Sequence, residues 1–532
     1  MFRKFSHGAI ILAVFFILSL CATGVYACTS VVVGKSATVD GSVLTSHTCD
    51  GTYEFRITVV PAADHAPGAM RPVYTGGGSG GHATPKTLVG QIPQVAHTYQ
   101  YFDIAYPFGN ANQVMMGETT IGSRSGLSSR NGLFQIWELE RVGLERAKTA
   151  REAIQIMGAI AEQYGYIDGG ECLTIVDGNE AWFFEIHASG PLNTGAIWAA
   201  QRIPDNHVGV SANRGRIGQL GTDPNYFMYS SNVHSFAQEM GWWSPADGPL
   251  HFSRVYSPKE SLYNSRREWR VLDILAPSYN LDPWEIYFPF SVVPDAKVSV
   301  EQVMNIKRDH YEGTEFDLTQ GVAAGPFGTP DRWATSSALG EWERAISLFR
   351  CSYVIVMQTR SWLPSEIGGV AWFGEDVPQS TCYIPIYCGV SSLPSILTTG
   401  ARNVFSRDSA WWAFQLVGNY ANLKYSYMIE DIKAVYTKFE SYFLKIQPAI
   451  ETVALDLYKQ DPKLAIDFLT NYTSTQATSV VNAWWDLFDT LVVKYQDGYV
   501  ARFNDNGTMS LGTVGYPMSW LDIVEFDALT YR

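Results

Sequence analysis

A cysteine that directly follows a short apolar segment is the residue of this chain best suited to nucleophilic chemistry. Cys28 stands after Ala27, and residues 9–20 form an apolar run, interrupted only by Ser19, behind a cationic start. A charged start, a short apolar core and small residues before a cut are typical of a secretory signal peptide, and this run is too short to span a bilayer. We therefore expect residues 1–27 to be removed and the chain to be exported, to the periplasm or the medium, without an integral membrane span.

A cut after Ala27 would give Cys28 two chemical functions at once. A free α-amine has a pKa of about 7.7–8, so part of it is neutral near pH 7 and able to take the proton of the thiol. The oxyanion formed from an amide would still need donors, such as main-chain N–H groups or an asparagine side chain. Two alternatives remain open: Cys28 as the acylated residue of a lipid-anchored binding protein without catalysis, and Cys28 as an inert buried thiol.

Composition indicates a globular protein and excludes some partners. The chain has 532 residues, of which 46% are apolar and 17% charged. These values are typical of a folded chain with a large core. The formal charge is −14, and loss of Arg3 and Lys4 makes it −16. Such a charge argues against nucleic acid or an anionic membrane surface as a partner.

Six cysteines remain after removal of the leader, too few for a disulfide scaffold. They are Cys28, Cys49, Cys172, Cys351, Cys382 and Cys388. Cys382 and Cys388, in CYIPIYC, could pair in an exported protein or remain two buried thiols on one strand. Both readings stay open.

The residues around Cys28 predict a β-hairpin. The β-branched run 29–34 and the run 42–47 flank the turn signal Asp40-Gly41. Cys28 is thereby expected at the start of the first strand.

The rest of the chain alternates between strand and helix patterns. Residues 133–164 and 299–311 have helical spacing, the chain from 408 onward is expected to be mostly helical, and residues 64–98, rich in Gly and Pro, are expected to be a long loop. Further strands are predicted at 171–176, 180–186, 195–202, 207–212, 352–359, 368–374 and 382–388. Paired strands with intervening helices favour an α+β, layered arrangement of antiparallel sheets over a parallel doubly wound sheet.

Common motifs of other enzyme classes are missing or lack their context. We find no H-E-x-x-H, P-loop, paired C-x-x-C or Rossmann fingerprint. A literal G-x-S-x-G at 77–81 lacks the preceding strand and the following helix that a serine nucleophile needs. His65, His82 and His97 lie in the same loop-rich stretch at a spacing that fits no common metal site.

The segment CTSVVVGKSATVDGSVLTSHTCDG at 28–51 resembles the start of a known group of enzymes. It is similar to the secreted cysteine dipeptidases of the N-terminal nucleophile (Ntn) hydrolase superfamily, the dipeptidase A and secernin group, which are related to bile salt hydrolases and penicillin V acylases. Five further segments resemble the same group in the same order: 144–154, 171–186, 208–218, 311–328 and 362–374. The resemblance covers most of the mature chain.

This resemblance implies a fold and an activity. It implies an αββα four-layer sandwich, which we place at residues 28–407, with a mostly helical region at 408–532 packed on it. It implies hydrolysis of dipeptides without a cofactor or metal ion. Relatives in the superfamily are often oligomeric, which leaves a homo-oligomer open. The same fold also serves N-acyl amide substrates, and that substrate class stays as an alternative.

The resemblance also assigns catalytic roles. Cys28 matches the nucleophile and its amine, and Asp50 matches the acidic residue that hydrogen-bonds near that amine. Asn213, in VSANRG, matches an asparagine of the oxyanion hole. Asn110, in PFGNANQV, stands where relatives have an asparagine that also points at the oxyanion.

Three further residues are candidates at the site. Arg267, in SRREWR, is our choice for the later active-site arginine, with Arg266 and Arg270 as rivals. His47 stands where family members commonly have an arginine near the thiol; a histidine lowers a thiol pKa only when it is protonated. Glu118, in MGETTIG, is a candidate for binding the amine of the substrate.

Overall fold

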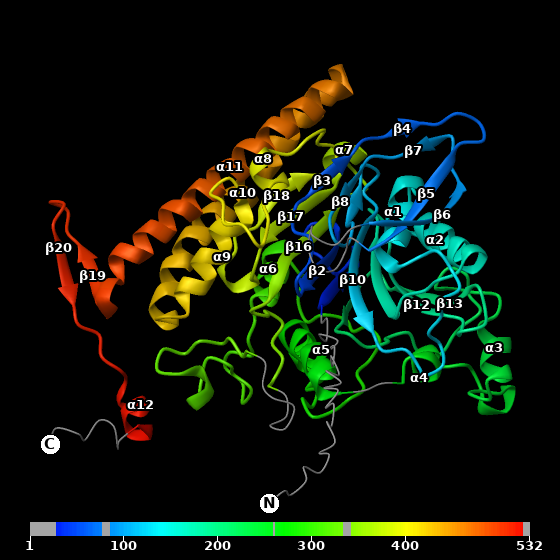
Figure 1. Cartoon of the computed structure of the whole chain (residues 1–532), viewed down its shortest axis with the longest axis horizontal. Helices are drawn as coiled ribbons and strands as arrows, with labels where there is room; N and C mark the ends of the chain where they lie inside the picture. Colours follow the sequence, from blue (N-terminus) through cyan, green and yellow to red (C-terminus); the bar gives the residue numbers. More distant parts are fainter. Residues whose placement is uncertain (1–27, 77–85, 259–260, 334–341, 525–532) are drawn as a thin grey trace, which may run out of the picture.

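A computed structural model describes residues 28–76, 86–258, 261–333 and 342–524. In this part of the chain two antiparallel sheets form the centre of the molecule (Figure 1). The six-stranded sheet has the order β14 (Val208–Ser211), β1 (Ser30–Val33), β2 (Val43–Asp50), β16 (Cys351–Thr359), β17 (Val370–Glu375), β18 (Ile384–Tyr387). The eight-stranded sheet has the order β15 (Phe227–Tyr229), β13 (Ala196–Ile203), β12 (Ala181–Ala188), β11 (Gly170–Val176), β10 (Met115–Ile121), β9 (Gly109–Asn110), β8 (Tyr101–Asp103), β3 (Thr58–Val60).

The two sheets face each other, with β2 in contact with β10, β11 and β12. Strands β1 and β2 are buried along their whole length because sheet or helix covers both of their faces. The predicted hairpin is present, with Val32 opposite Thr45 and Val33 opposite Leu44. It places Cys28 just before β1, at one end of the interface between the two sheets.

Helices cover the outer faces of the sheets (Figure 1). On the eight-stranded sheet lie α1 (Ile136–Arg146) and α2 (Ala150–Tyr164), the two helices of the predicted segment 133–164. The six-stranded sheet is covered by α5 (Leu262–Leu275), α6 (Val300–Lys307), α9 (Ala410–Ala421) and α11 (Pro462–Lys494), with α10 (Tyr425–Gln460) against α11. The short helices are α3 (Val233–Glu239), α4 (Phe252–Tyr256), α7 (Ser365–Gly368), α8 (Ser395–Thr398) and α12 (Met518–Ile523).

One expectation needs correction, that of a long loop at 64–98, while the described chain from 408 onward is mostly helical as predicted. The predicted loop 64–98 contains short strands, β4 (Ala63–Asp64), β5 (Met70–Thr75), β6 (Thr87–Pro93) and β7 (His97–Thr98), while residues 77–85, with the literal G-x-S-x-G and His82, lie outside the described residues. The hairpin of β5 and β6 is stabilised by Val73 and Ile92, which are buried in the core, and by Arg71, which pairs with two glutamates of α1. A second hairpin, β19 (Val500–Phe503) with β20 (Met509–Gly512), follows the C-terminal helices.

The two cysteines of CYIPIYC flank β18, the last strand in the order of the six-stranded sheet. Cys382 and Cys388 are free thiols on either side of it. Six residues of extended strand span about 20 Å, at about 3.3 Å per residue. A disulfide needs Cα atoms within roughly 7 Å, so the strand keeps the two thiols apart.

Two further expectations meet the structure only in part. The proposed boundary at 407/408 stays a prediction, and residues of α9, α10 and α11 belong to the same hydrophobic core as the sheets. Residues 1–27 lie outside the described residues. Among the described helices, none has the length and apolarity needed to cross a membrane.

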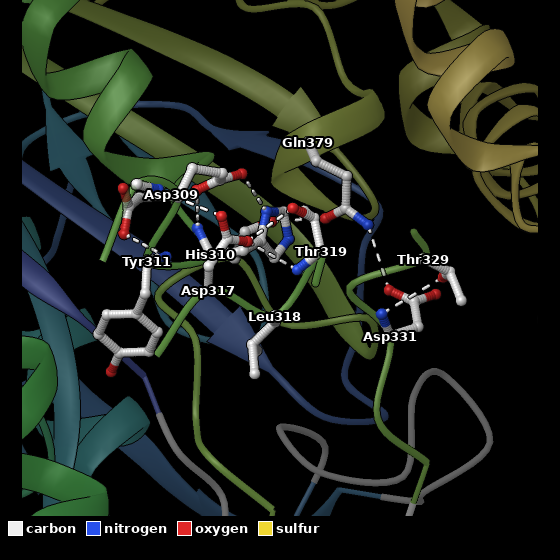
Figure 2. Close-up of polar contacts among 12 residues, drawn as sticks. Asp309, His310, Tyr311, Asp317, Leu318, Thr319, Thr329, Asp331 and Gln379 are labelled. Carbon is white, nitrogen blue, oxygen red and sulfur yellow. Dashed lines mark hydrogen bonds and ion pairs between the residues drawn. The ribbon is translucent and has the colours of Figure 1, made fainter. Parts of the chain in front are cut away.

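Polar side chains of residues 309–331, the segment that follows α6, hydrogen-bond to neighbours within the segment and to Gln379 (Figure 2). Asp317 accepts hydrogen bonds from the main-chain N–H groups of Thr319 and Gly313, at 2.8 and 3.1 Å. Tyr311 donates from its hydroxyl to the carbonyl of Arg344 at 2.6 Å. Part of the segment that carries the family resemblance therefore positions an arginine of the site described next.

Candidate active site

Cys28 lies between the two sheets, fully buried at the start of β1. Its thiol donates to Oε2 of Glu118 on β10, with 3.4 Å between Sγ and oxygen. Burial, followed by the carboxylates of Glu118 and Asp50, raises the pKa of the Cys28 thiol well above its ordinary value. The thiol in this setting is protonated at neutral pH, so attack on a carbonyl requires a base that removes its proton.

Arg267, on α5, ties the start of β1 to the end of β14. It is fully buried, and burial, with a smaller contribution from the charge of Arg344, lowers its pKa to about 10, which leaves it charged at neutral pH. Its guanidinium donates to six oxygens at 2.8–3.2 Å: the carbonyls of Tyr263, Cys28 and Ala212 and the side chains of Thr29, Asn213 and Asn264. Of the three arginines of SRREWR, the predicted residue, Arg267, is the one that contacts Cys28.

The two rival arginines point elsewhere. Arg266 pairs with Glu343 and stacks on Phe316, and Arg270 forms a bidentate pair with Asp309. Successive helix residues face different directions, so only one of the three can reach the sheet end.

Asn213 lies two residues after the end of β14 and has a left-handed backbone, with φ of 63°. Its Oδ1 accepts from Arg267 at 3.0 Å and its Nδ2 donates to the carbonyl of Thr120 at 2.7 Å. Asparagine tolerates this backbone conformation better than most residues. The amide is therefore oriented from both sides, close to the strand that carries Glu118.

Asp50 ends β2 next to the thiol, whose sulfur accepts a hydrogen bond from the Asp50 main chain. Its Oδ2 pairs with Arg344 at 2.5 Å and accepts from Thr48 at 3.2 Å. Its Oδ1 is buried and accepts from no N–H or O–H group of the described residues. One oxygen is thus fixed, and the other is available to a donor that arrives at the start of the mature chain.

Glu118 shares a hydrogen bond with a second buried carboxyl, Glu171 on β11. Burial raises the pKa of both groups, and the carboxyl of Glu118 raises that of Glu171 further. Two carboxyls that share a hydrogen bond out of water retain a proton between them. Glu118 and Glu171 therefore form a buried acidic pair next to Cys28. No lysine or arginine of the described residues forms an ion pair with either carboxyl.

His47 does not supply the positive charge of the family arginine. Its Nδ1 lies 2.8 Å from the carbonyl oxygen of Glu118, and burial lowers its pKa to about 3. The imidazole is neutral at physiological pH. Ligand atoms of Cys28, His47 and Glu118 all lie within 4.8 Å of one another, a donor set that a soft divalent cation such as Zn²⁺ accepts.

The structure does not bring Asn110 into this cluster. Its Nδ2 donates to the carbonyls of Leu144 and Ala147, both at 2.8 Å. Its Oδ1 accepts from the N–H groups of Asn112 and Val114. The Asn110 side chain joins the C-terminal end of α1 to the turn after β9, so its amide groups are occupied away from Cys28.

Sequence reasoning missed two cations of the site. Arg344 pairs with Asp50, and the ammonium of Lys307, on α6, donates to the carbonyl of Thr29. Burial lowers the pKa of Lys307 to about 7. Neither residue stands in a motif. Lys307 reaches the residue before β1 from α6, and Arg344 reaches the end of β2 from the 342–350 segment.

Comparison with known proteins gives the family. The model of peptidase family C69 matches residues 27–438. A probable dipeptidase of Salmonella dublin is 28% identical over 70% of this chain and 84% of its own length. A probable dipeptidase of Latilactobacillus sakei is 26% identical, covering 72% and 79%, and a probable dipeptidase A of Streptococcus pyogenes serotype M1 is 23% identical, covering 76% and 84%. This chain belongs to peptidase family C69.

Proposed function

We propose that the chain is an exported dipeptidase that uses the N-terminal cysteine of its mature form as nucleophile. The observation that carries the proposal is the convergence of Asp50, Glu118, Asn213 and Arg267 around Cys28. Membership in a peptidase family and the names of the relatives support the substrate class. We further propose that the order of helices, two facing sheets and helices is the αββα sandwich of the Ntn hydrolases.

The proposed reaction begins with the cut after Ala27. The new α-amine of Cys28 hydrogen-bonds the unpartnered Oδ1 of Asp50 and takes the proton of the thiol. The thiolate attacks the peptide carbonyl, and the oxyanion accepts from Nδ2 of Asn213 and from main-chain N–H groups. Collapse of the tetrahedral intermediate breaks the C–N bond, and the second amino acid leaves with the proton held by the amine. Water, deprotonated by the same amine, hydrolyses the thioester and releases the first amino acid.

The acidic pair favours dipeptides over N-acyl amides. A dipeptide presents an ammonium group one carbon from the carbonyl that Cys28 attacks, and Glu118 lies 3.4 Å from that sulfur. An ammonium matches a carboxylate by charge and by hydrogen bonding. An N-acyl group would place apolar atoms against the same buried carboxyl, which costs free energy.

Glu118→Gln should therefore raise KM for dipeptides by about 10- to 100-fold, the effect of removing one charged hydrogen bond. The same change should leave the KM for an N-acetylated substrate unchanged or lower it. Steady-state kinetics on both substrates measure this. Glu239→Gln, at an exposed glutamate of α3, is the control and should match the unaltered protein. Equal effects of Glu118→Gln on both substrates would contradict an ammonium site.

His47→Gln should leave the acidic limb of the pH profile of kcat/KM in place between pH 5 and 8. The pKa of His47 is lowered to about 3, so its ring is already neutral over this range and gains no proton that activity could report. The limb should instead follow the α-amine, near its ordinary pKa of about 7.7–8. A shift of the limb in His47→Gln that His97→Gln does not share would assign the titration to His47.

The direct test is the intact mass and N-terminal residue of the exported protein, followed by a panel of dipeptides and N-acyl amides. A chain that begins at unmodified Cys28 and cleaves dipeptides is expected. Cleavage of acyl amides alone would replace the substrate class. A diacylglycerol on Cys28 would favour the lipid-anchored binding protein, because the thioether occupies the sulfur that the reaction needs as its nucleophile.

A further inference from the structure

A cavity of about 130 Å³ lies beside the active site, behind the segment that follows β14. Its volume is well above the ~10–15 Å³ that one water molecule requires. The polar groups on its wall come mainly from three arginines and two serines: Arg214, Arg216, Arg254, Ser253 and Ser257.

Two of these arginines are buried and share one carboxylate. Arg214 and Arg216 both pair with Glu268, at 3.0 and 2.5 Å, and all three side chains are almost fully buried. The Oε1 of a second carboxyl, Glu185, accepts from the main-chain N–H groups of Arg216 and Ile217. Three guanidinium groups thus line the wall, and one carboxylate, that of Glu268, forms ion pairs with two of them.

Two buried donor atoms on the wall have no hydrogen-bond acceptor among the described residues. Nε of Arg216 and Oγ of Ser257 are buried and unpartnered in the described chain. Arg254 is exposed, stacks on the ring of Tyr287 at 4.8 Å, and forms no ion pair with any described carboxylate. A buried N–H without an acceptor is costly, and a bound anion would satisfy it.

The cavity adjoins the active site through two pairs of neighbouring residues. On α5, Arg267 contacts the carbonyl of Cys28 and the next residue, Glu268, holds the cavity arginines. After β14, Asn213 belongs to the active site and the next residue, Arg214, lines the cavity. Consecutive Cα atoms are about 3.8 Å apart. In a dipeptide only one residue separates the cleaved carbonyl from the terminal carboxylate.

We propose that this cavity, named here the arginine pocket and defined by Arg214, Arg216, Arg254, Ser253 and Ser257, binds a small anion of the carboxylate or oxyanion class. Two sources share this chemistry: the C-terminal carboxylate of the dipeptide, and a free anion such as inorganic phosphate. The first source rests on the proposed dipeptidase function, and the second does not.

The anion arm of the test measures thermal unfolding of the full chain in sodium acetate or sodium phosphate, against sodium chloride at equal ionic strength. Acetate or phosphate is expected to raise Tm, and Arg254→Met and Ser257→Ala are each expected to reduce that rise. Arg407→Met, at an exposed arginine far from the pocket in sequence, should keep it. The absence of an anion-specific rise, or its equal loss in Arg407→Met, would overturn the proposal even if the protein proves to have no dipeptidase activity.

The substrate arm distinguishes the two sources. If the pocket holds the substrate carboxylate, Arg254→Met raises KM for a dipeptide about tenfold, the order expected for one charged hydrogen bond, with kcat unchanged. The KM for the same dipeptide with a C-terminal amide stays as in the unaltered protein, and Arg254→Lys restores part of the loss. An anion-dependent Tm with unchanged KM for both substrates supports the pocket and assigns it to a free anion.

Discussion

Cys28→Ala is expected to abolish dipeptide hydrolysis, with a fall in kcat of at least about 10³-fold. The substitution removes the sulfur that is proposed to form the thioester, which lies 3.4 Å from Glu118 and near Asn213 and Arg267. Cys28→Ser should retain a trace of activity, because a hydroxyl in the same place gives up its proton far less readily than a thiol. Release of free amino acids from a dipeptide, followed over hours, measures both variants.

Cys388→Ala is the matched control for this substitution. Cys388 is also a fully buried free thiol next to a strand of the six-stranded sheet. It makes no contact with the cluster around Cys28 among the hydrogen bonds of the described residues. Its alanine variant should lose some stability and keep kcat. Full activity in Cys28→Ala would reject the cysteine mechanism, whatever the control shows.

Arg267→Met should cost about 3 kcal/mol or more of unfolding free energy and lower kcat at least about 100-fold. Five of the six oxygens that the guanidinium bonds are buried, and methionine satisfies none of the six. Removal of a buried charge offsets part of this loss, since the charge itself is costly to bury. The effect on kcat follows because Asn213 loses the donor that fixes its amide. Chemical denaturation and single-turnover kinetics measure the two parts separately.

Two companion variants separate positioning from general loss of stability. Arg267→Lys keeps the charge but reaches fewer of the six oxygens, so it should recover part of the stability and little of the activity. Arg270→Met lies on the same helix and removes the contacts of Arg270 with Asp309, Asp273 and the carbonyl of Glu312, none of which involves the cluster around Cys28, so it should lower stability with kcat retained. A similar kcat in Arg267→Met and the unaltered protein would remove Arg267 from the site.

Several features of this protein could be predicted from local sequence because local physics decides them. The hairpin after Cys28 follows from β-branched runs on either side of Asp40-Gly41, and the strands around Asp177-Gly178 follow from the same kind of signal. Helical periodicity predicted α1 and α2. The loop prediction for 64–98 was wrong because Gly, Pro and Thr obscured strands that only packing on α1 stabilises.

The position of Cys28 could be predicted from the local sequence, whereas the identity of its nearest polar neighbours required the tertiary structure. The sequence by itself determined that a cysteine would start the first strand, since apolar run, small residues and strand are contiguous. The tertiary structure alone decided that Lys307 reaches the start of β1 and Arg344 the end of β2. It also decided that Glu171 pairs with Glu118 and that Asn110 bonds the end of α1. These contacts join residues far apart along the chain. Which side chains meet depends on how two sheets and their helices are set against each other, and no local periodicity encodes that.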